Sequence, residues 1–223
     1  MIGDISHICN RGFKKHIIFS DEKDYLRFVL NLYRLNNKDG SLRIAKNKHP
    51  FSDLPKQNKL VEILKWTLLP NHYHLLLYEK TEGGIVEFVK RLGNAYTKYL
   101  NIKHSSGGYV FQNSAKIIPI DEDAQYTYIP FYIDLNPVDF LSVKSGDTNK
   151  QKVLDSLSKY SWSSYRDYFG NFSQFLPIIN KELFYELFDH DPKSYQKEIL
   201  NLLKKDGFDE LTKHVNLPGW HTD

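Results

Sequence analysis

The chain has 223 residues, 41% of them hydrophobic, which is enough for one large domain or a domain with an appendage. Its single cysteine, Cys9, excludes an intramolecular disulfide and a zinc site built from several cysteines. No run approaches about 18 apolar residues and the first residues lack a basic, apolar leader, so we expect a cytoplasmic protein without membrane spans. The net charge of +3 divides into +5 for residues 1–150 (21 Lys and Arg, 16 Asp and Glu) and −2 for residues 151–223 (9 and 11), which favours a polyanionic partner for the N-terminal part.

The first elements alternate between strand and helix. Residues 5–19 predict a strand that is broken by a turn at Gly12. Ser20 and Asp21 are N-cap residues for the next helix, whose apolar side chains recur at helical spacing up to about Asn36. Residues 39–58 predict a long basic loop, with a short strand at 41–45 as an option. This loop is either a solvated surface segment or a flap that contacts the polyanion.

Residues 60–69 and 72–79 predict a β-hairpin whose turn is formed by Pro70 and Asn71. On the second strand, His72 and His74 are spaced by two, so their side chains leave the same face, about 7 Å apart at their Cα atoms. Both imidazoles can then reach one divalent metal ion. The alternative is two unrelated histidines on a half-exposed strand.

The segment after the hairpin predicts a helix over residues 85–102, a strand over 109–120 with a bend near Asn113, and another helix. The acidic residues 121–123 suit the start of this last helix, and Pro137 ends it after Asn136. Pro130 removes one main-chain donor, so we expect it to kink the helix or to mark its real start.

The C-terminal part begins with a polar linker over residues 142–151 and then predicts helices at 153–157, 181–188, 195–205 and 208–214. We expect a catalytic domain over residues 1–141 and a mostly helical extension over residues 142–223. The turn that contains Trp162 and Tyr165 either packs this extension onto the core or stacks nucleobases. The order of elements predicts an α+β protein with a ferredoxin-like core, in which helices flank a small antiparallel sheet.

The helix that precedes Pro137 offers the best third metal ligand. Tyr132 and Asn136 lie on one helical face because they are four residues apart. Asp134 lies about 160° away from Asn136 around the helix, so Asn136 is the better oxygen ligand. A phenol beside a metal held by two histidines can attack a phosphodiester and form a covalent link to DNA. Alternatively, Tyr132 packs in the core and Asn136 caps the helix before Pro137.

Five motifs in chain order resemble those of the HUH single-tyrosine transposases, in their REP-associated branch. The motifs are CNRGFKKHIIF at residues 9–19 with Asp21, Asp24 and Tyr25, PNHYHLLL at 70–77, GYVFQ at 108–112, YIDLNP at 132–137 and WSSYRDY at 162–168. The resemblance implies Mg²⁺- or Mn²⁺-dependent cleavage and joining of single-stranded or hairpin DNA at repeated extragenic palindromes, through a 5′-phosphotyrosine. It makes His72 and His74 metal ligands, Asn136 the third ligand and Tyr132 the nucleophile.

The residues that surround the first strand are candidates for DNA contact. Arginine and lysine neutralise phosphates, and arginine also binds base edges. The candidates are Asn10, Arg11, Lys14, Lys15, Arg91 and Lys98. The alternative to DNA contact is a charged surface turn at the end of the first strand. Besides the transposase, acting as a monomer or a homodimer, two functions remain open. One is a domesticated DNA-hairpin-binding protein without catalysis, which Pro130 motivates. The other is a His-metal hydrolase of small phosphoesters, which would need more histidines or carboxylates.

Overall fold

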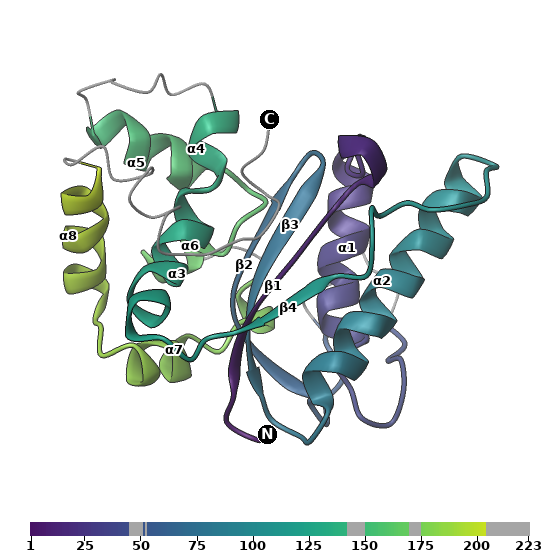
Figure 1. The fold of residues 1–223 in the computed structure, drawn as a ribbon, viewed down its shortest axis with the longest axis horizontal. Coiled ribbons are helices and arrows are strands. Elements are labelled where there is room, and N and C mark those ends of the chain that lie inside the picture. The colour runs from purple at the N-terminus through teal and green to yellow at the C-terminus, as the bar shows by residue number, and fades with distance from the viewer. Residues whose placement is uncertain (45–50, 52, 142–149, 170–174, 204–223) are drawn as a thin grey trace.

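A four-stranded antiparallel sheet organises the computed structural model, which describes residues 1–44, 51, 53–141, 150–169 and 175–203 (Figure 1). The strands run in the order β2-β3-β1-β4 across the sheet. Their bounds are β1, Ile5–Arg11; β2, Val61–Leu69; β3, His72–Glu79; and β4, Lys116–Pro119. Strand β3 therefore lies at the centre, paired with β2 on one side and β1 on the other.

Helices cover both faces of this sheet, and Figure 1 shows them in two groups. Helices α1 (Glu22–Arg34) and α2 (Gly84–Lys103) lie on one face, and they connect β1 to β2 and β3 to β4. The second group consists of α3, Asp123–Leu135; α4, Pro137–Phe140; α5, Lys150–Lys159; α6, Tyr165–Tyr168; α7, Lys181–Leu187; and α8, Pro192–Leu202. The connectivity β1-α1-β2-β3-α2-β4 with this strand order is ferredoxin-like, so the predicted fold class is confirmed. No helix of the described residues is long and apolar enough to cross a membrane.

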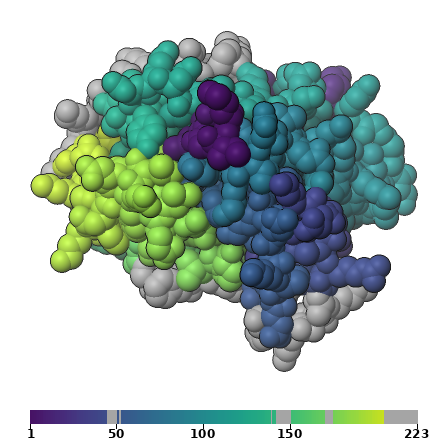
Figure 2. All heavy atoms as spheres, turned by 90° about the horizontal axis from the view of Figure 1, so that it is seen from below, coloured from purple at the N-terminus to yellow at the C-terminus, as the bar shows by residue number. Residues whose placement is uncertain are grey.

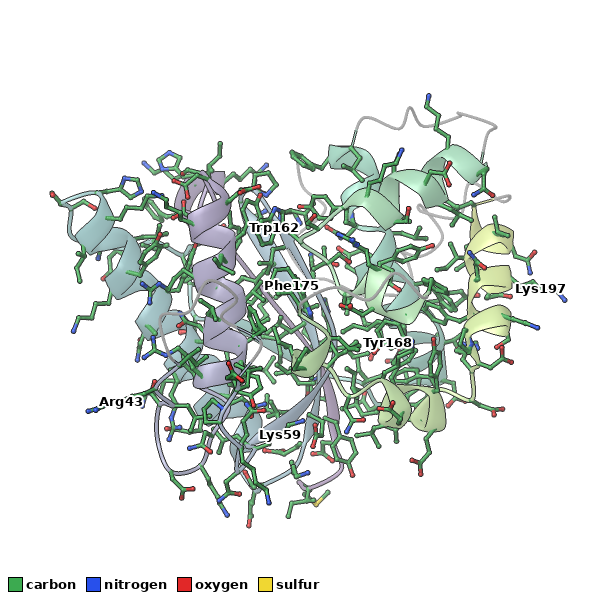
Figure 3. The ribbon with its side chains drawn as sticks, turned by 180° about the vertical axis from the view of Figure 1, so that it is seen from behind. Arg43, Lys59, Trp162, Tyr168, Phe175 and Lys197 are labelled. Carbon is green, nitrogen blue, oxygen red and sulfur yellow. The ribbon has the colours of Figure 1, made fainter. Side chains whose placement is uncertain are left out.

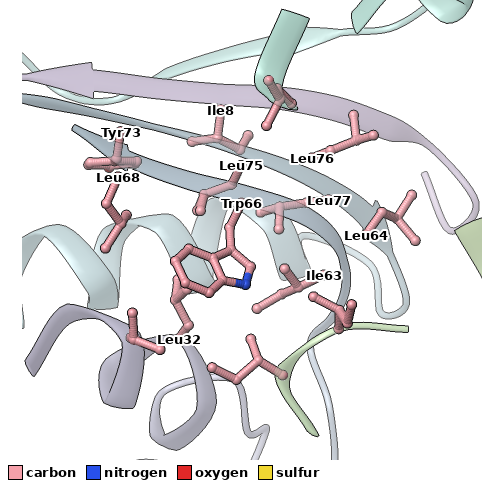
Figure 4. Close-up of a cluster of buried hydrophobic side chains, with 14 of the residues drawn as sticks. Ile8, Leu32, Ile63, Leu64, Trp66, Leu68, Tyr73, Leu75, Leu76 and Leu77 are labelled. Carbon is pink, nitrogen blue, oxygen red and sulfur yellow. The ribbon is translucent and has the colours of Figure 1, made fainter. Parts of the chain in front are cut away.

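The β2–β3 hairpin sets which side chains meet which helices. Leu69 pairs with His72 across the turn, and alternation along β3 then sends successive side chains to opposite faces. The face toward α1 and α2 is apolar, and its buried cluster in Figure 4 includes Ile8, Leu32, Trp66, Tyr73, Leu75 and Leu77. Burying each such large side chain stabilises the fold by roughly 1.5–3 kcal/mol. His72 and His74 point to the opposite face.

Helix α1 begins where its capping residue predicts. The Asp21 carboxylate accepts hydrogen bonds from the main-chain N–H groups of Lys23 and Asp24, at 2.9 and 3.1 Å. Such a cap contributes about 1 kcal/mol. The helix then buries Phe28 against Tyr73, with ring centroids 4.8 Å apart. This contact fixes α1 over the centre of the sheet.

The outer edge of β2 is covered by the C-terminal part of the chain. The Leu68 N–H donates to the Trp162 carbonyl at 2.9 Å, and the Ser164 N–H donates to the Trp66 carbonyl at 2.9 Å. Trp162 itself stacks on Tyr25, with ring centroids 4.7 Å apart, and Figure 3 shows it near α1. The packing interpretation of Trp162 is therefore confirmed. These bonds satisfy an edge that would otherwise invite pairing with another chain.

The helices after α4 share their core with the sheet. Tyr168, Phe184 and Tyr195 are at most 1% exposed and belong to the same buried cluster as the strands. In the space-filling view of Figure 2, the green and yellow C-terminal residues lie directly against the earlier part of the chain. The boundary proposed at residues 141 and 142 adjoins a segment outside the described residues, so the division into two domains stays a prediction.

Three sequence expectations need correction. The strand expected at 109–120 is only Lys116–Pro119, because the turn around Gly108, whose φ is 111°, and the polar bend before Lys116 leave Phe111 with an isolated bridge to Gly12. Residues 41–44 form no strand, and Ala45 lies outside the described residues. Helix α5 already begins at Lys150, within the expected linker. The expected helix at 208–214 and residues 142–149 lie outside the described residues.

Pro130 neither starts nor ends its helix. Helix α3 runs from Asp123 to Leu135, with Pro130 inside it and Asn136 as its C-cap. Proline costs this helix the bond that residue 130 would donate to the Tyr126 carbonyl. The last turn nevertheless closes, because the Asn136 N–H donates to the Tyr132 carbonyl at 3.0 Å.

Candidate functional site

The sheet face opposite α1 and α2 carries four side chains of metal-ligating type at its centre. We call His7, Cys9, His72 and His74 the histidine cluster. The β1–β3 register places Cys9 directly opposite His74, and residues two apart on one strand share a face. His7, Cys9 and His74 are fully buried, and their ligand atoms all lie within 4.8 Å of one another. This group can hold a metal ion.

Helix α3 adds the predicted phenol and amide to the histidine cluster. The Tyr132 ring lies edge-on to His74, with centroids 5.3 Å apart, and its centroid is 6.1 Å from that of His7. The Asn136 Oδ1 is 3.0 Å from the His72 Nε2. The structure therefore brings the four predicted residues together within one chain, although Tyr132 is only 4% exposed.

The hydrogen bonds of His72 orient its second nitrogen toward Asn136. The Asn71 amide donates from Nδ2 to the Lys15 carbonyl at 3.3 Å, so its Oδ1 faces the His72 Nδ1 at 2.7 Å. An oxygen only accepts, so Nδ1 carries the proton and Nε2 keeps its lone pair. That lone pair faces a second acceptor, the Asn136 Oδ1. A cation between the two atoms, or rotation of the Asn136 amide, relieves the repulsion.

The separation between the His72 Nε2 and the Asn136 Oδ1 suits two neighbouring ligands of an octahedral metal ion. Two neighbouring ligand atoms of an octahedral Mg²⁺ site, each about 2.1 Å from the ion, lie about 3.0 Å apart. The distance from His72 Nε2 to Asn136 Oδ1 is 3.0 Å. The His74 ring centroid is 5.2 Å from that of His72, near enough for a third ligand. The donor set of two imidazoles and an amide oxygen therefore fits a divalent cation.

Sequence reasoning missed two members of the cluster as site residues, Cys9 and His7. The His7 Nε2 lies 2.9 Å from the His74 Nδ1, and the two rings meet end to end, with centroids 5.1 Å apart. The signal was present, because His7 and Cys9 repeat the spacing of two that singled out His72 and His74. That spacing becomes informative only when β1 is known to neighbour β3.

Burial keeps the histidines of the cluster neutral. It lowers the pKa of His7 to about 3 and that of His72 to about 4, although the Asn136 oxygen, which would accept a hydrogen bond from the protonated ring, opposes the second shift. Burial also holds the pKa of His74 well below its usual range, helped by the charges of the neighbouring histidines. Neutral imidazoles are the form that binds metals.

A buried ion pair anchors α3 to the sheet. The Lys65 Nζ on β2 donates to the Asp134 Oδ2 at 2.7 Å, and the Tyr195 hydroxyl donates to the same oxygen at 2.9 Å. The Lys65 Nζ also lies 3.8 Å from the ring centroid of Tyr168. Asp134 thus points away from the histidine cluster, as its helical position predicted, and lies between Tyr132 and Asn136 in sequence.

The predicted DNA-contacting residues fall into two groups. The first lies at the end of β1: Lys14 and Lys15 are exposed, with φ values of 50° and 61°. In the same group, Arg11 donates to the Gln112 Oε1 at 2.6 Å, and Asn10 donates to the Asn113 carbonyl at 3.1 Å.

The second group lies on α2, across the sheet from the histidine cluster. Arg91 binds Glu87 on its own helix at 2.6 Å and the Asn37 carbonyl at 2.7 Å, and Lys98 is exposed. The structure does not bring these two residues to the cluster, and their contact with DNA stays a prediction.

A small cavity borders the cluster beside the end of β1. It has a volume of about 200 Å³ and is lined by Cys9, Asn10, Arg11, Gln112, Asn113, Ser114 and Lys116. Lys116 pairs with Cys9 across β1 and β4. Sequence reasoning did not identify Lys116, because its position depends on the pairing of β4. Two cationic side chains therefore line a cavity that reaches Cys9.

Comparison with known proteins finds similarity at the level of three-dimensional structure. No family model matches the chain, and no curated protein matches it. A solved structure described as a REP-associated tyrosine transposase bound to a REP hairpin is similar, with a TM-score of 0.47 and 14% sequence identity. The match covers 78% of this chain and 84% of that chain. The description of that structure names the family that the sequence motifs resemble, and the similarity assigns no residue role in this chain.

Proposed function

We propose that this protein is a metal-dependent DNA strand transferase, which cuts and rejoins single-stranded or hairpin DNA through Tyr132. One observation carries the proposal: the donors His72, His74 and Asn136 converge beside the Tyr132 ring on one face of the sheet. The sequence motifs extend it to repeated extragenic palindromes as targets. All four side chains come from one chain, so we write the chemistry for a monomer.

In this proposal His72, His74 and Asn136 hold the divalent cation. Mg²⁺ or Mn²⁺ bound there would polarise the scissile phosphate and offset the charge that develops on it. Asn71 fixes the His72 ring by accepting from its Nδ1. His7 fixes the His74 ring through the 2.9 Å contact at Nδ1. Such partners of ligating histidines orient the ligands and set their tautomers.

Tyr132 acts as the nucleophile. Its phenol releases a proton to water, the phenolic oxygen forms a bond to phosphorus, and the 3′-oxygen leaves with the bonding electrons and takes up a proton. The product is a 5′-phosphotyrosine. The 3′-hydroxyl of another strand then attacks that phosphorus, and Tyr132 leaves and recovers its proton. Each step exchanges one phosphodiester for another, so no ATP is needed.

The basic end of β1 would hold the DNA backbone. Lys14 and Lys15 are exposed beside the hairpin turn, where the Asn71 side chain donates to the Lys15 carbonyl at 3.3 Å. They are therefore close in the fold to His72, the residue that follows Asn71. Neutralising a phosphate with each lysine predicts an affinity that falls as salt rises.

The test is a covalent adduct assay with hairpin oligonucleotides in Mg²⁺ or Mn²⁺. With a 3′-labelled hairpin, the wild-type protein should carry label through denaturing electrophoresis, and with a 5′-labelled hairpin it should release a shortened free product. Tyr132→Phe should form no adduct, whereas Tyr128→Phe, one turn earlier on the same helix, should form it normally. Failure of the wild type with every hairpin, or an adduct that survives in Tyr132→Phe, contradicts the proposal.

The burial of Tyr132 favours one alternative, a hairpin-binding protein without catalysis. At 4% exposure, the ring meets DNA only if the segments that cover it move. The same experiment separates the two functions. Hairpin binding that is equal in wild type and Tyr132→Phe, with no adduct in either, would identify the alternative.

A further inference from the structure

We propose that His7, Cys9 and His74 form a second cation site, selective for a thiophilic ion such as Zn²⁺, and that an ion bound there excludes one from the His72–His74–Asn136 site. The zinc site stands on the geometry around Cys9 alone. Only its consequence for DNA cleavage rests on the proposed function.

The two histidine nitrogens have nearly the spacing that a tetrahedral ion needs. Two nitrogens bound to one Zn²⁺ at about 2.05 Å lie about 3.3 Å apart. The His7 Nε2 and the His74 Nδ1 are 2.9 Å apart, within hydrogen-bond distance, so an ion that binds both displaces the proton between them and moves the two nitrogens a few tenths of an ångström apart. His7, Cys9 and His74 each offer one ligand atom, and these three atoms lie within 4.8 Å of one another. The register of β1 with β3 holds all three side chains on one face.

The donor types select the ion. A thiolate with two imidazoles binds Zn²⁺ far better than Mg²⁺, which prefers oxygen ligands. Three protein ligands leave a fourth position, as in open zinc sites. The 200 Å³ cavity that borders Cys9 offers room for a water there and a route by which the ion enters. Burial raises the pKa of the Cys9 thiol to about 12 against a smaller opposing effect of the Lys116 ammonium, so the ion must displace the thiol proton as it binds.

The two sites compete because they share one ring. A neutral imidazole has one protonated nitrogen and one lone pair. His74 directs Nδ1 toward His7, which leaves Nε2 for the ion held by His72 and Asn136. An ion on Nδ1 requires the proton on Nε2, and that nitrogen then cannot bind a second ion. A thiophilic metal should therefore act as an inhibitor that is antagonistic to Mg²⁺ or Mn²⁺.

The zinc site is tested with Co²⁺ and Zn²⁺ on the full chain, without any DNA. Co²⁺ in the wild type should give a thiolate-to-cobalt charge-transfer band, and the zinc X-ray absorption spectrum should contain one sulfur neighbour at about 2.3 Å. Cys9→Ala should abolish the band and weaken Zn²⁺ at least tenfold. His72→Ala should keep both, because His72 is not a ligand of this site. A wild-type spectrum without sulfur, which needs no variant to fold, overturns the proposal.

The exclusion is tested by Mn²⁺ binding, followed through the magnetic resonance signal of the free ion. One equivalent of Zn²⁺ should release Mn²⁺ from the wild type, and the same Zn²⁺ should release at least tenfold less from Cys9→Ala. Simultaneous binding of both ions to the wild type overturns the exclusion. Neither readout measures DNA cleavage, so a protein that binds each ion as stated but cuts no DNA would contradict the proposed function alone, and the zinc result stands even if no Mn²⁺ binds.

Discussion

The Lys65–Asp134 pair makes the sharpest stability prediction. Both side chains are completely buried, and the carboxylate has its second oxygen, Oδ1, without a hydrogen-bond partner among the described residues. Burial raises the pKa of Asp134 and lowers that of Lys65, while the attraction between them opposes both shifts. Lys65→Met leaves the carboxylate in place with only the Tyr195 hydroxyl. Removing one partner of a buried pair costs about 3–5 kcal/mol.

The size of this cost follows from protonation. In Lys65→Met the folded state keeps Asp134 neutral, which costs about 1.4 kcal/mol for each pH unit above its ordinary pKa of about 3.9. The deficit relative to wild type should therefore be about 4 kcal/mol at pH 7 and about 1.5 kcal/mol at pH 5. The sign follows from the raised pKa: the stability is present at low pH and is lost as pH rises.

Urea unfolding followed by circular dichroism at both pH values measures this deficit. The double variant Lys65→Met/Asp134→Leu is the matched control, because it removes both charges and should recover most of the loss. The single variant should also lower the yield of the Tyr132 adduct, since α3 loses its anchor on β2. A deficit below about 1 kcal/mol, a deficit that grows on acidification, or a double variant less stable than the single one would refute the reasoning.

Two further predictions concern the histidine cluster and the glycines. Because the pKa values of His7 and His72 fall to about 3 and about 4, the unfolded chain binds more protons than the folded one below pH 6.5, so stability is retained above that pH and lost below it. Together with His74, whose pKa is also held well below its usual range, these groups should lower the unfolding free energy by about 4 kcal/mol between pH 7.5 and 5.5, and His7→Gln should remove about a third of this drop; equal slopes would contradict the assignment. A Cβ at Gly12 would collide with the His16 main-chain oxygen, so Gly12→Ala should lower the melting temperature. Gly93 lies within α2 with no atom in the way of a Cβ, so Gly93→Ala should stabilise the protein by about 0.5–1 kcal/mol. Thermal unfolding of both variants compares them, and a neutral Gly12→Ala would speak against the tight turn after β1.

Much of the fold could be predicted because its signals are local. The spacing of His72 and His74 and the helical spacing over residues 22–34 each lie within one element, and Asp21 caps its helix through neighbouring main-chain groups. The strand expected at 109–120 was too long, because the apolar residues near Phe111 do not indicate whether another strand lies close enough to pair with them. Only Lys116–Pro119 finds β1.

Part of the candidate site could also be predicted from local signals. The spacing of two placed His72 and His74 on one face, and the angle around the helix favoured Asn136 over Asp134. The structure has Asn136 facing His72 and Asp134 facing Lys65. Neither the roles of these residues nor that of Tyr132 follows from position alone, so they stay predictions for the adduct and metal experiments.

The sequence by itself determined the elements, the faces they present and the pair of histidines at the hairpin turn. Tertiary structure alone decided what those faces meet. His7 reaches His74 only through the β1–β3 register, and a slip of one residue would turn it to the other side of the sheet. Lys65 becomes a buried cation only because Asp134, 69 residues later, arrives on α3 to balance it. Such contacts join distant segments, and no local spacing encodes them.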